Sequence, residues 1–230
     1  PLVGQLDLLN DLGHAIRAEE GGTFVALDFT DLFGDPALAL PGLALARDSA
    51  CLHGRLQVSG FGAYTMRTEY GVLFGRSETE LGFRRFDPFL TAMGEASHAL
   101  PARLRPAGWR SVFLHPHDMR FYSRNKIMPA AGFDELLGEA CFPPPPAGAG
   151  RYVTDDALAS RIIDMAAAAR NPTLIYAVTI ENHGPWPPDQ AEGHARHSAA
   201  YLRLARNSDT MLSTLMEALG DLGRPALLLF

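Results

Sequence analysis

The chain has 230 residues, of which 47% are hydrophobic and 20% are charged, and its formal net charge is -6 at pH 7. This composition is typical of a globular protein that is long enough to bury one sizeable core. The negative net charge excludes a sequence-wide electrostatic attraction to nucleic acid or to an anionic membrane surface. We therefore expect no nucleic-acid partner.

The first 22 residues have the pattern of a helix that ends in glycine. Leucine and isoleucine recur near helical spacing in residues 5–20, and Gly21 and Gly22 follow. No run in the chain reaches the roughly 20 apolar residues that span a bilayer, and the N-terminus lacks the order of a signal peptide. We interpret residues 5–20 as a helix and residues 23–230 as one domain.

Strand-like runs alternate with polar or glycine-bearing loops and helices along the rest of the chain. The predicted strands are residues 23–27, 56–58, 111–114, 173–180 and 226–230. The predicted helices are residues 65–73, 154–170 and 197–222. Residues 142–150, with four consecutive prolines, are interpreted as a surface loop rather than a linker between domains.

This alternation predicts an α/β fold with a mostly parallel central sheet and helices on both faces. Ligands of such sheets bind beyond the carboxyl ends of the strands. Four residues with suitable chemistry follow predicted strands, namely Asp31, Thr65, His115 and His183. We expect them to form the functional site.

Thr65 follows a loop of small residues and begins a predicted helix. Free backbone N–H groups and the helix dipole at such a position favour a negatively charged oxygen, so the hydroxyl could act as a nucleophile if a metal also binds it. The same local sequence fits a helix cap equally well. Glu69, one turn later, is interpreted as structural support for the loop.

The segment around Thr65 resembles a known family. Residues 62–70 (Gly-Ala-Tyr-Thr-Met-Arg-Thr-Glu-Tyr), followed by Leu-Phe-Gly at 73–75, are similar to the nucleophile segment of lipoteichoic acid synthases and membrane phosphoglycerol transferases. These enzymes form a branch of the sulfatase, or alkaline phosphatase-like, superfamily. The resemblance implies that fold, and it implies that Thr65 is both the covalent nucleophile and a metal ligand.

Two further blocks resemble the same family. His115, the run Phe121-Tyr-Ser-Arg-Asn125, Met128 and Gly132-Phe-Asp134 are similar to its His, Phe-Trp-Asn-Arg, Met and Gly-Tyr-Asp pattern. Residues 179–186 (Thr-Ile-Glu-Asn-His-Gly-Pro-Trp) are similar to its Ser-Asn-His-Gly-Pro-aromatic loop. The resemblance implies that His115, Tyr122, Arg124 and His183 bind the substrate, and arginine suits phosphoryl oxygens because its planar fork donates two hydrogen bonds.

The resemblance also implies one divalent cation, manganese in many relatives. Its ligands would be a carboxylate after the first strand, Thr65, and an Asp-His pair after a late strand. Asp31 takes the place of the carboxylate when Asp35-Pro36 is aligned with the family, although Asp28 is close enough to compete. Carboxylate and hydroxyl oxygens suit such a cation. The Asp-His pair is expected after Phe230, so we expect the C-terminal part of the domain to be missing.

The function implied by the resemblance is transfer of a phosphoglycerol-type group from a phospholipid head group to a cell-envelope glycan. Two alternatives stay open: a sulfate or phosphate ester hydrolase of the same fold, and a non-catalytic binder of anionic glycans or head groups. No Cys/Ser-x-Pro-x-Arg motif surrounds Thr65, which counts against the sulfatases proper. The resemblance places the domain at the extracytoplasmic face of the bacterial cytoplasmic membrane. It implies an N-terminal membrane anchor before residue 1, with residues 1–22 as a helical connector to that anchor.

Overall fold

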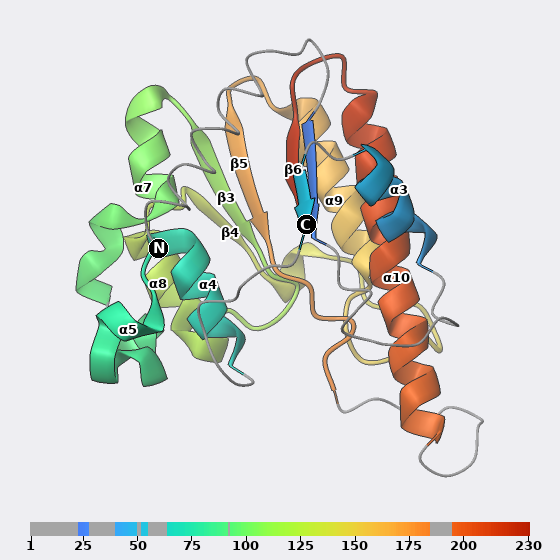
Figure 1. Ribbon diagram of the computed structural model, residues 1–230, viewed down its shortest axis with the longest axis horizontal. Coiled ribbons are helices and arrows are strands. Elements are labelled where there is room, and N and C mark those ends of the chain that lie inside the picture. Colours follow the sequence, from blue (N-terminus) through green and yellow to red (C-terminus); the bar gives the residue numbers. More distant parts are fainter. Residues whose placement is uncertain (1–22, 28–39, 50–51, 55–63, 92, 185–194) are drawn as a thin grey trace. The chain divides into compact units, whose positions relative to one another are not determined.

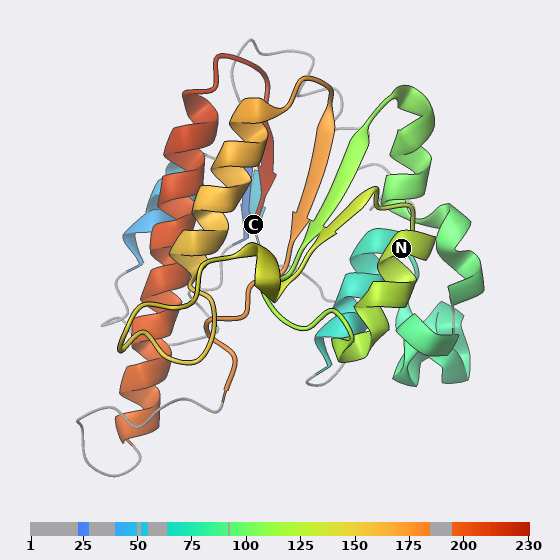
Figure 2. The ribbon, with the colours of Figure 1, turned by 180° about the vertical axis from the view of Figure 1, so that it is seen from behind.

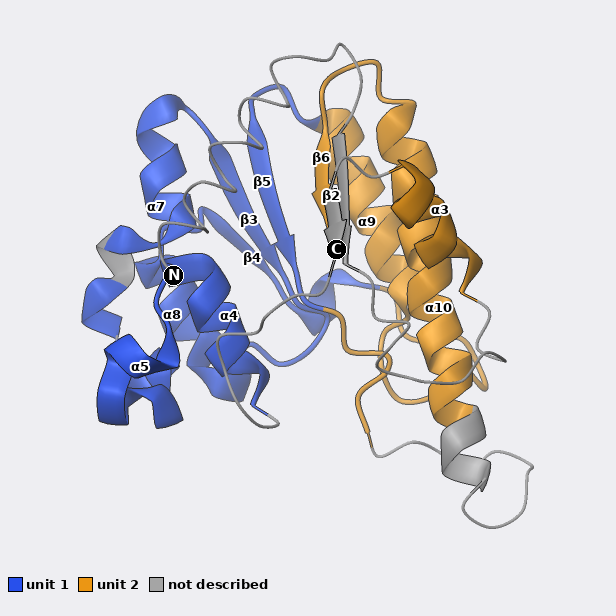
Figure 3. Cartoon of the chain, in the orientation of Figure 1, with its two compact units in different colours: residues 1–5, 57–142, 169–178 blue, residues 6–56, 143–168, 179–230 orange. Residues whose placement is uncertain are grey.

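The computed structural model describes residues 23–27, 40–49, 52–54, 64–91, 93–184 and 195–230 (Figure 1). The chain divides into two compact units (Figure 3). Unit 1 comprises Pro1–Gln5, Gln57–Phe142 and Ala169–Val178, and unit 2 comprises Leu6–Leu56, Pro143–Ala168 and Thr179–Phe230. Each unit contains a three-stranded sheet in which every strand pair is parallel, which confirms the predicted α/β class.

Unit 1 combines the sheet β4-β3-β5 with short helices, of which those marked η are 3-10 helices. Its elements are α4 (Thr65–Phe74), α5 (Glu78–Leu81), η1 (Gly82–Phe86), α6 (Pro88–Thr91), η2 (Met93–His98), α7 (Leu100–Leu104), η3 (Arg105–Ala107), β3 (Arg110–Leu114), η4 (Phe121–Ser123), α8 (Arg124–Ala130), β4 (Glu135–Leu137), η5 (Glu139–Cys141) and β5 (Thr173–Ala177).

The core of unit 1 lies between the central strand β3 and the helices α4, α6 and α8. Phe113 of β3 is completely buried and belongs to one apolar cluster with Tyr70, Phe89 and Ile127 from these helices. The parallel register pairs Leu114 with the last residues of β4 and β5. The three strands therefore end at the same edge of the sheet, and the residues that follow them gather there.

Helix α4 has a defined end because its last turn is closed by glycine. Gly75 adopts the left-handed conformation at φ 64°, and its N–H donates to the Gly71 carbonyl at 3.0 Å. Glycine is suited to this position because it lacks the Cβ that disfavours positive φ. The helix that begins at Thr65 therefore ends at Phe74.

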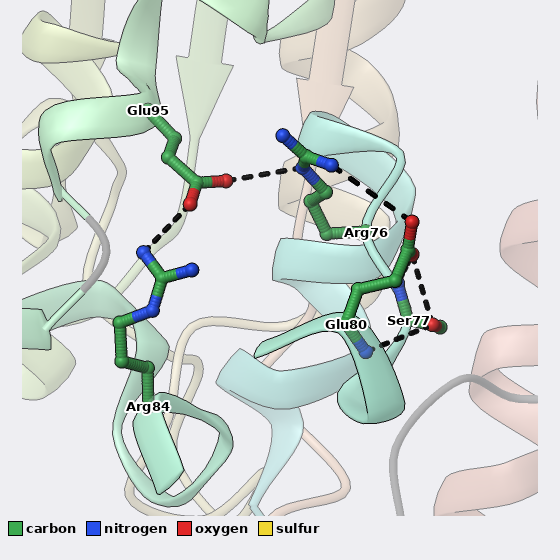
Figure 4. Close-up of polar contacts among 5 residues, drawn as sticks. All are labelled: Arg76, Ser77, Glu80, Arg84 and Glu95. Carbon is green, nitrogen blue, oxygen red and sulfur yellow. Dashed lines mark hydrogen bonds and ion pairs between the residues drawn. The ribbon is translucent and has the colours of Figure 1, made fainter. Parts of the chain in front are cut away.

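A network of charged side chains supports the short helices that follow α4 (Figure 4). Glu95 accepts from Arg76 Nε at 3.1 Å and from Arg84 Nη1 at 2.6 Å. Ser77 caps α5 and forms a capping box with Glu80, whose carboxylate also lies 3.8 Å from Arg76. The network joins α5, η1 and η2, which have few apolar residues of their own.

Unit 2 contains the sheet β2-β1-β6, built from β1 (Thr23–Leu27), β2 (Leu52–Gly54) and β6 (Leu227–Leu229). Its helices are α3 (Pro41–Ser49), α9 (Asp155–Ala168) and α10 (Ala195–Gly220). The back view shows α9 and α10 side by side (Figure 2). Leu43 and Ala46 of α3 pack against Leu212 and Met216 of α10. Asp209 of α10 accepts the N–H groups that begin α3, from Gly42 at 2.8 Å and Leu43 at 2.6 Å.

The predicted elements that fall on described residues are confirmed, with small differences in their bounds. The structure has strands near 23–27, 111–114, 173–180 and 226–230, and helices near 65–73, 154–170 and 197–222. The strand predicted at 56–58 and the connector helix in 1–22 lie outside the described residues. None of the described helices is both long and apolar enough to cross a membrane.

Candidate active site

Thr65 is the first residue of α4, and its side chain is exposed. The N-cap position belongs to Tyr64, whose extended backbone (φ -97°, ψ 99°) leads into the helix without a side-chain capping bond. The capping interpretation of Thr65 is therefore wrong. The hydroxyl lies at the positive end of a ten-residue helix, where the dipole favours an anionic oxygen or a phosphoryl group.

Glu69 lies one turn after Thr65 on the same side of α4 and forms a buried ion pair with Arg124 of α8. Their exposed fractions are 4% and 1%. Arg124 Nε donates to Glu69 Oε2 at 3.2 Å, and Nη2 donates to Glu69 Oε1. Arg124 Nη1 also donates to the Phe121 carbonyl at 3.4 Å. The predicted phosphate-binding arginine thus has a carboxylate partner inside unit 1.

Tyr122 lies against this ion pair in an unusual backbone conformation. Tyr122 and Ser123 both have positive φ, 55° and 54°, and they are the only such non-glycine residues among those the structure describes. Positive φ costs a bulky residue free energy, so surrounding contacts must hold it. One such contact is the Arg124 guanidinium, 5.2 Å from the centre of the Tyr122 ring.

The pKa of the Tyr122 phenol reflects the same surroundings. Burial raises this pKa above its usual value, and the positive charge of Arg124 opposes the rise. The negative charge of Glu69 and the ionised form of Tyr64 raise it further, because like charges disfavour ionisation. The phenol is therefore neutral at pH 7 and can donate a hydrogen bond to a ligand.

A series of ring contacts runs from the end of β3 to Tyr122. His115 and His117 have ring centres 5.7 Å apart, His117 and Phe121 5.6 Å, and Phe121 and Tyr122 4.2 Å. His115 is 2% exposed, and its Nδ1 lies 3.0 Å from the Val178 carbonyl. A carbonyl only accepts, so Nδ1 carries the proton. Unit 1 therefore brings Thr65, His115, Tyr122 and Arg124 into one compact body.

His183 belongs to unit 2, in the loop after β5, and its side chain is exposed. Its Nδ1 lies 2.7 Å from the Gly184 carbonyl, so this nitrogen also carries a proton. The Tyr152 ring packs edge-on against the imidazole with ring centres 6.1 Å apart. Nε2 can therefore donate to a phosphoryl oxygen only when the imidazole is doubly protonated.

Glu181 anchors the loop that carries His183. It is 5% exposed, and its carboxylate accepts from the Asp155 N–H at 2.7 Å and from Asn207 Nδ2 at 2.8 Å. Asp155, also buried, accepts from Ser208 Oγ at 2.5 Å. The loop is thus joined to the first turn of α9 and to the middle of α10. Glu181 occupies the serine position of the family pattern.

The predicted metal ligands are only partly within the described residues. Thr65 offers one exposed hydroxyl oxygen, which suits a hard divalent cation. Asp31 and its competitor Asp28 lie outside the described residues, as does any residue after Phe230. Within the described part of the chain, no three His, Cys, Asp or Glu side chains are grouped to hold a metal ion.

Comparison with known proteins identifies the class. The model of the family described as Sulfatase matches residues 23–230, so the chain belongs to the sulfatase family. The capsular polysaccharide biosynthesis protein RkpI of Rhizobium meliloti (strain 1021) is 34% identical over 202 residues, which are 86% of this chain and 37% of RkpI. The chain spans about a third of the length of the curated relatives it matches.

Two solved structures have the same fold. The lipoteichoic acid synthase LtaP of Listeria monocytogenes has a TM-score of 0.65 at 14% identity, over 92% of this chain and 55% of LtaP. The phosphoglycerol transferase GacH of Streptococcus pyogenes, in complex with sn-glycerol-1-phosphate, has a TM-score of 0.61 at 14% identity, over 98% of this chain and 66% of GacH. These similarities confirm the predicted alkaline phosphatase-like fold.

Sequence reasoning named Thr65, His115, Tyr122 and Arg124 but missed the partner that the structure gives to Arg124. Glu69 lies 55 positions away in the sequence, and no local pattern links the two. The role of Glu181 was missed as well. The sequence did contain a clue, because Glu181 stands where the family loop has serine. A charged side chain directly after an apolar strand needs a buried partner, and this could have pointed to its role.

Proposed function

We propose that the chain is the catalytic part of a metal-dependent phosphotransferase that moves a phosphoglycerol-type group from a phospholipid to a cell-envelope glycan. The observation that carries the proposal is the exposed Thr65 hydroxyl at the start of α4, in the same unit as His115, Tyr122 and Arg124. The similarity to RkpI, a polysaccharide biosynthesis protein, supports a glycan acceptor. For this function we place the domain at the extracytoplasmic face of the membrane, where an N-terminal anchor would hold it.

In the first step, the Thr65 oxygen attacks the phosphorus of the lipid head group and forms a new phosphorus–oxygen bond. The bond from phosphorus to the diacylglycerol oxygen breaks, and that oxygen takes up a proton. Thr65 loses its own proton to solvent, to which it is exposed. In the second step, a glycan hydroxyl attacks the phosphorus, loses its proton, and Thr65 leaves and regains one. Two displacements through a covalent intermediate replace one difficult displacement.

The other site residues bind and orient the substrate. The neutral Tyr122 phenol contacts the glycerol part of the head group. Arg124 orients the Tyr122 ring, because its guanidinium nitrogens already donate to Glu69 and to the Phe121 carbonyl. The Nδ1 protons of His115 and His183 face backbone carbonyls, so these side chains donate from Nε2 to the phosphoryl oxygens only in the doubly protonated form. Charge that develops on the phosphoryl oxygens in the transition state strengthens these contacts.

A divalent cation, with manganese as our proposal, would be held by the Thr65 hydroxyl and the Asp31 carboxylate. Asp28 is the alternative carboxylate, and an Asp-His pair after Phe230 would complete the ligands. Such a cation lowers the pKa of the bound hydroxyl and neutralises charge on the phosphoryl group.

The test is Thr65→Ala in the full-length protein, incubated with labelled phosphatidylglycerol. We expect diacylglycerol release to fall by at least about a hundredfold, because a nucleophile in a two-step displacement cannot be bypassed. Thr68→Ala, the same change three residues later in α4, is the matched control and should keep the parental rate. Release at the parental rate by the Thr65 variant would exclude it as the nucleophile.

The identity of the acceptor separates the transferase from the alternatives. Transfer of the labelled group to a glycan supports the transferase, whereas transfer to water alone indicates an ester hydrolase. Absence of release together with absence of bound metal, measured by mass spectrometry on the full-length protein, indicates a non-catalytic binder.

A further inference from the structure

The Glu69–Arg124 ion pair connects the helix of the nucleophile to the segment that carries Tyr122. Glu69 follows Thr65 by four residues on α4, so the two side chains lie on one side of the helix, about 6 Å apart along its axis. Arg124 is the first residue of α8, directly after the left-handed residues Tyr122 and Ser123. This pair is therefore a direct charged link between the two elements.

The geometry of the pair determines where the guanidinium lies. Two of its nitrogens, Nε and Nη2, donate to the two carboxylate oxygens of Glu69, and this fork arrangement allows one orientation of the guanidinium plane. With the plane set, Nη1 reaches the Phe121 carbonyl, and the guanidinium covers the Tyr122 ring at 5.2 Å. A lysine or an unpaired arginine could not reproduce these contacts.

Tyr122 depends on this support because its backbone is strained. A tyrosine at φ 55° returns to a common conformation unless its surroundings hold it. Its ring contacts Phe121, at 4.2 Å between ring centres, Arg124, and the apolar cluster of unit 1. Arg124 is itself held in place by two hydrogen bonds to Glu69 and one to the Phe121 carbonyl.

We propose that Glu69 is a positioning residue that, through Arg124, places the Tyr122 ring at a constant distance from Thr65 and so sets the affinity for the glycerol part of the substrate. This inference rests on the proposed function, in which Tyr122 contacts the head group. Glu69 itself touches no substrate. Its effect is therefore confined to ligands that have a head group beyond the phosphoryl group.

The experiment uses Glu69→Asp in the full-length protein, with binding of sn-glycerol 1-phosphate and of inorganic phosphate measured by calorimetry. Aspartate keeps the charge but is one methylene too short to hold both nitrogens of Arg124. We expect the Kd for glycerol phosphate to rise at least about tenfold and the Kd for inorganic phosphate to stay within about a factor of two. Arg124→Lys, which cannot form the fork, should show the same selective loss and serves if the aspartate variant does not fold.

Asp209→Asn is the matched control, since it removes another buried carboxylate that holds a helix but lies in unit 2. It should leave both dissociation constants unchanged. A parallel rise for both ligands in Glu69→Asp would show a merely structural role and overturn the inference, as would no change for either. If the parental protein binds neither ligand, the proposed function fails as well.

A double-mutant cycle tests whether Glu69 acts through Tyr122. In a Tyr122→Ala background, Glu69→Asp should have no further effect on the Kd for glycerol phosphate, because the ring that it positions is gone. If each substitution raises this Kd by its own factor and the two factors multiply in the double variant, the inference is contradicted.

Discussion

The buried carboxyl of Asp155 lowers the stability of this protein at neutral pH, and its removal should raise it. Burial, together with the nearby charge of Glu181, raises the pKa of Asp155 from 3.8 to about 6, while the hydrogen bond from Ser208 acts in the opposite direction. Between these two values the folded state binds more protons than the unfolded state. The free energy of unfolding therefore falls as pH rises through this window and stays lower above it.

The magnitude follows from the size of the shift. About two pKa units correspond to about 3 kcal/mol of destabilisation above pH 6. Asparagine at this position keeps the acceptor for Ser208 and carries no charge. It loses a favourable interaction between a carboxylate and the N-terminus of α9, which is typically about 1 kcal/mol. Asp155→Asn should therefore raise the free energy of unfolding by about 2 kcal/mol at pH 7.5 and change it little at pH 4.

The assay is urea unfolding of the parental and variant proteins at half-unit steps from pH 4 to pH 8. Asp156→Asn is the matched control, because this neighbour is also in the first turn of α9 but is exposed. It should not change the pH dependence of the parental protein. A stability difference between Asp155→Asn and the parent that stays constant from pH 4 to pH 8 would refute the reasoning, as would a variant that is less stable at pH 7.5.

Three further substitutions test the packing of unit 1 by urea unfolding. Gly132→Ala should cost about 2 kcal/mol or more, since φ is +97° and the new Cβ would lie 2.8 Å from the Ala102 nitrogen; an unchanged midpoint would contradict the backbone geometry. Phe113→Ala should cost about 3–5 kcal/mol because its side chain is completely buried, and a loss below about 1 kcal/mol would place it outside the core. Ser77→Ala should cost about 1 kcal/mol through loss of the capping box with Glu80, and no loss would show that α5 does not depend on its cap.

Much of the fold could be predicted because its signals are local. An apolar run such as residues 111–114 becomes a strand, and Gly75 ends α4, because both features depend on neighbours in the sequence. The prediction of a helix beginning at Thr65 succeeded for the same reason. The elements β2 and β4 were not predicted, since each has three residues and is a strand only through its pairing with β1 or β3.

The candidate site shows the same difference between local features and features that depend on tertiary packing. The sequence alone offered Thr65, His115 and Arg124 as candidates for phosphoryl chemistry, because they stand in motifs that resemble those of a known family in the same order. Only the tertiary structure decided that Arg124 is buried against Glu69 and that Tyr122 adopts a left-handed backbone. Burial and ion pairing depend on which segments, distant in the sequence, pack together in the fold. The order of two segments along the chain does not reveal whether they are close in space.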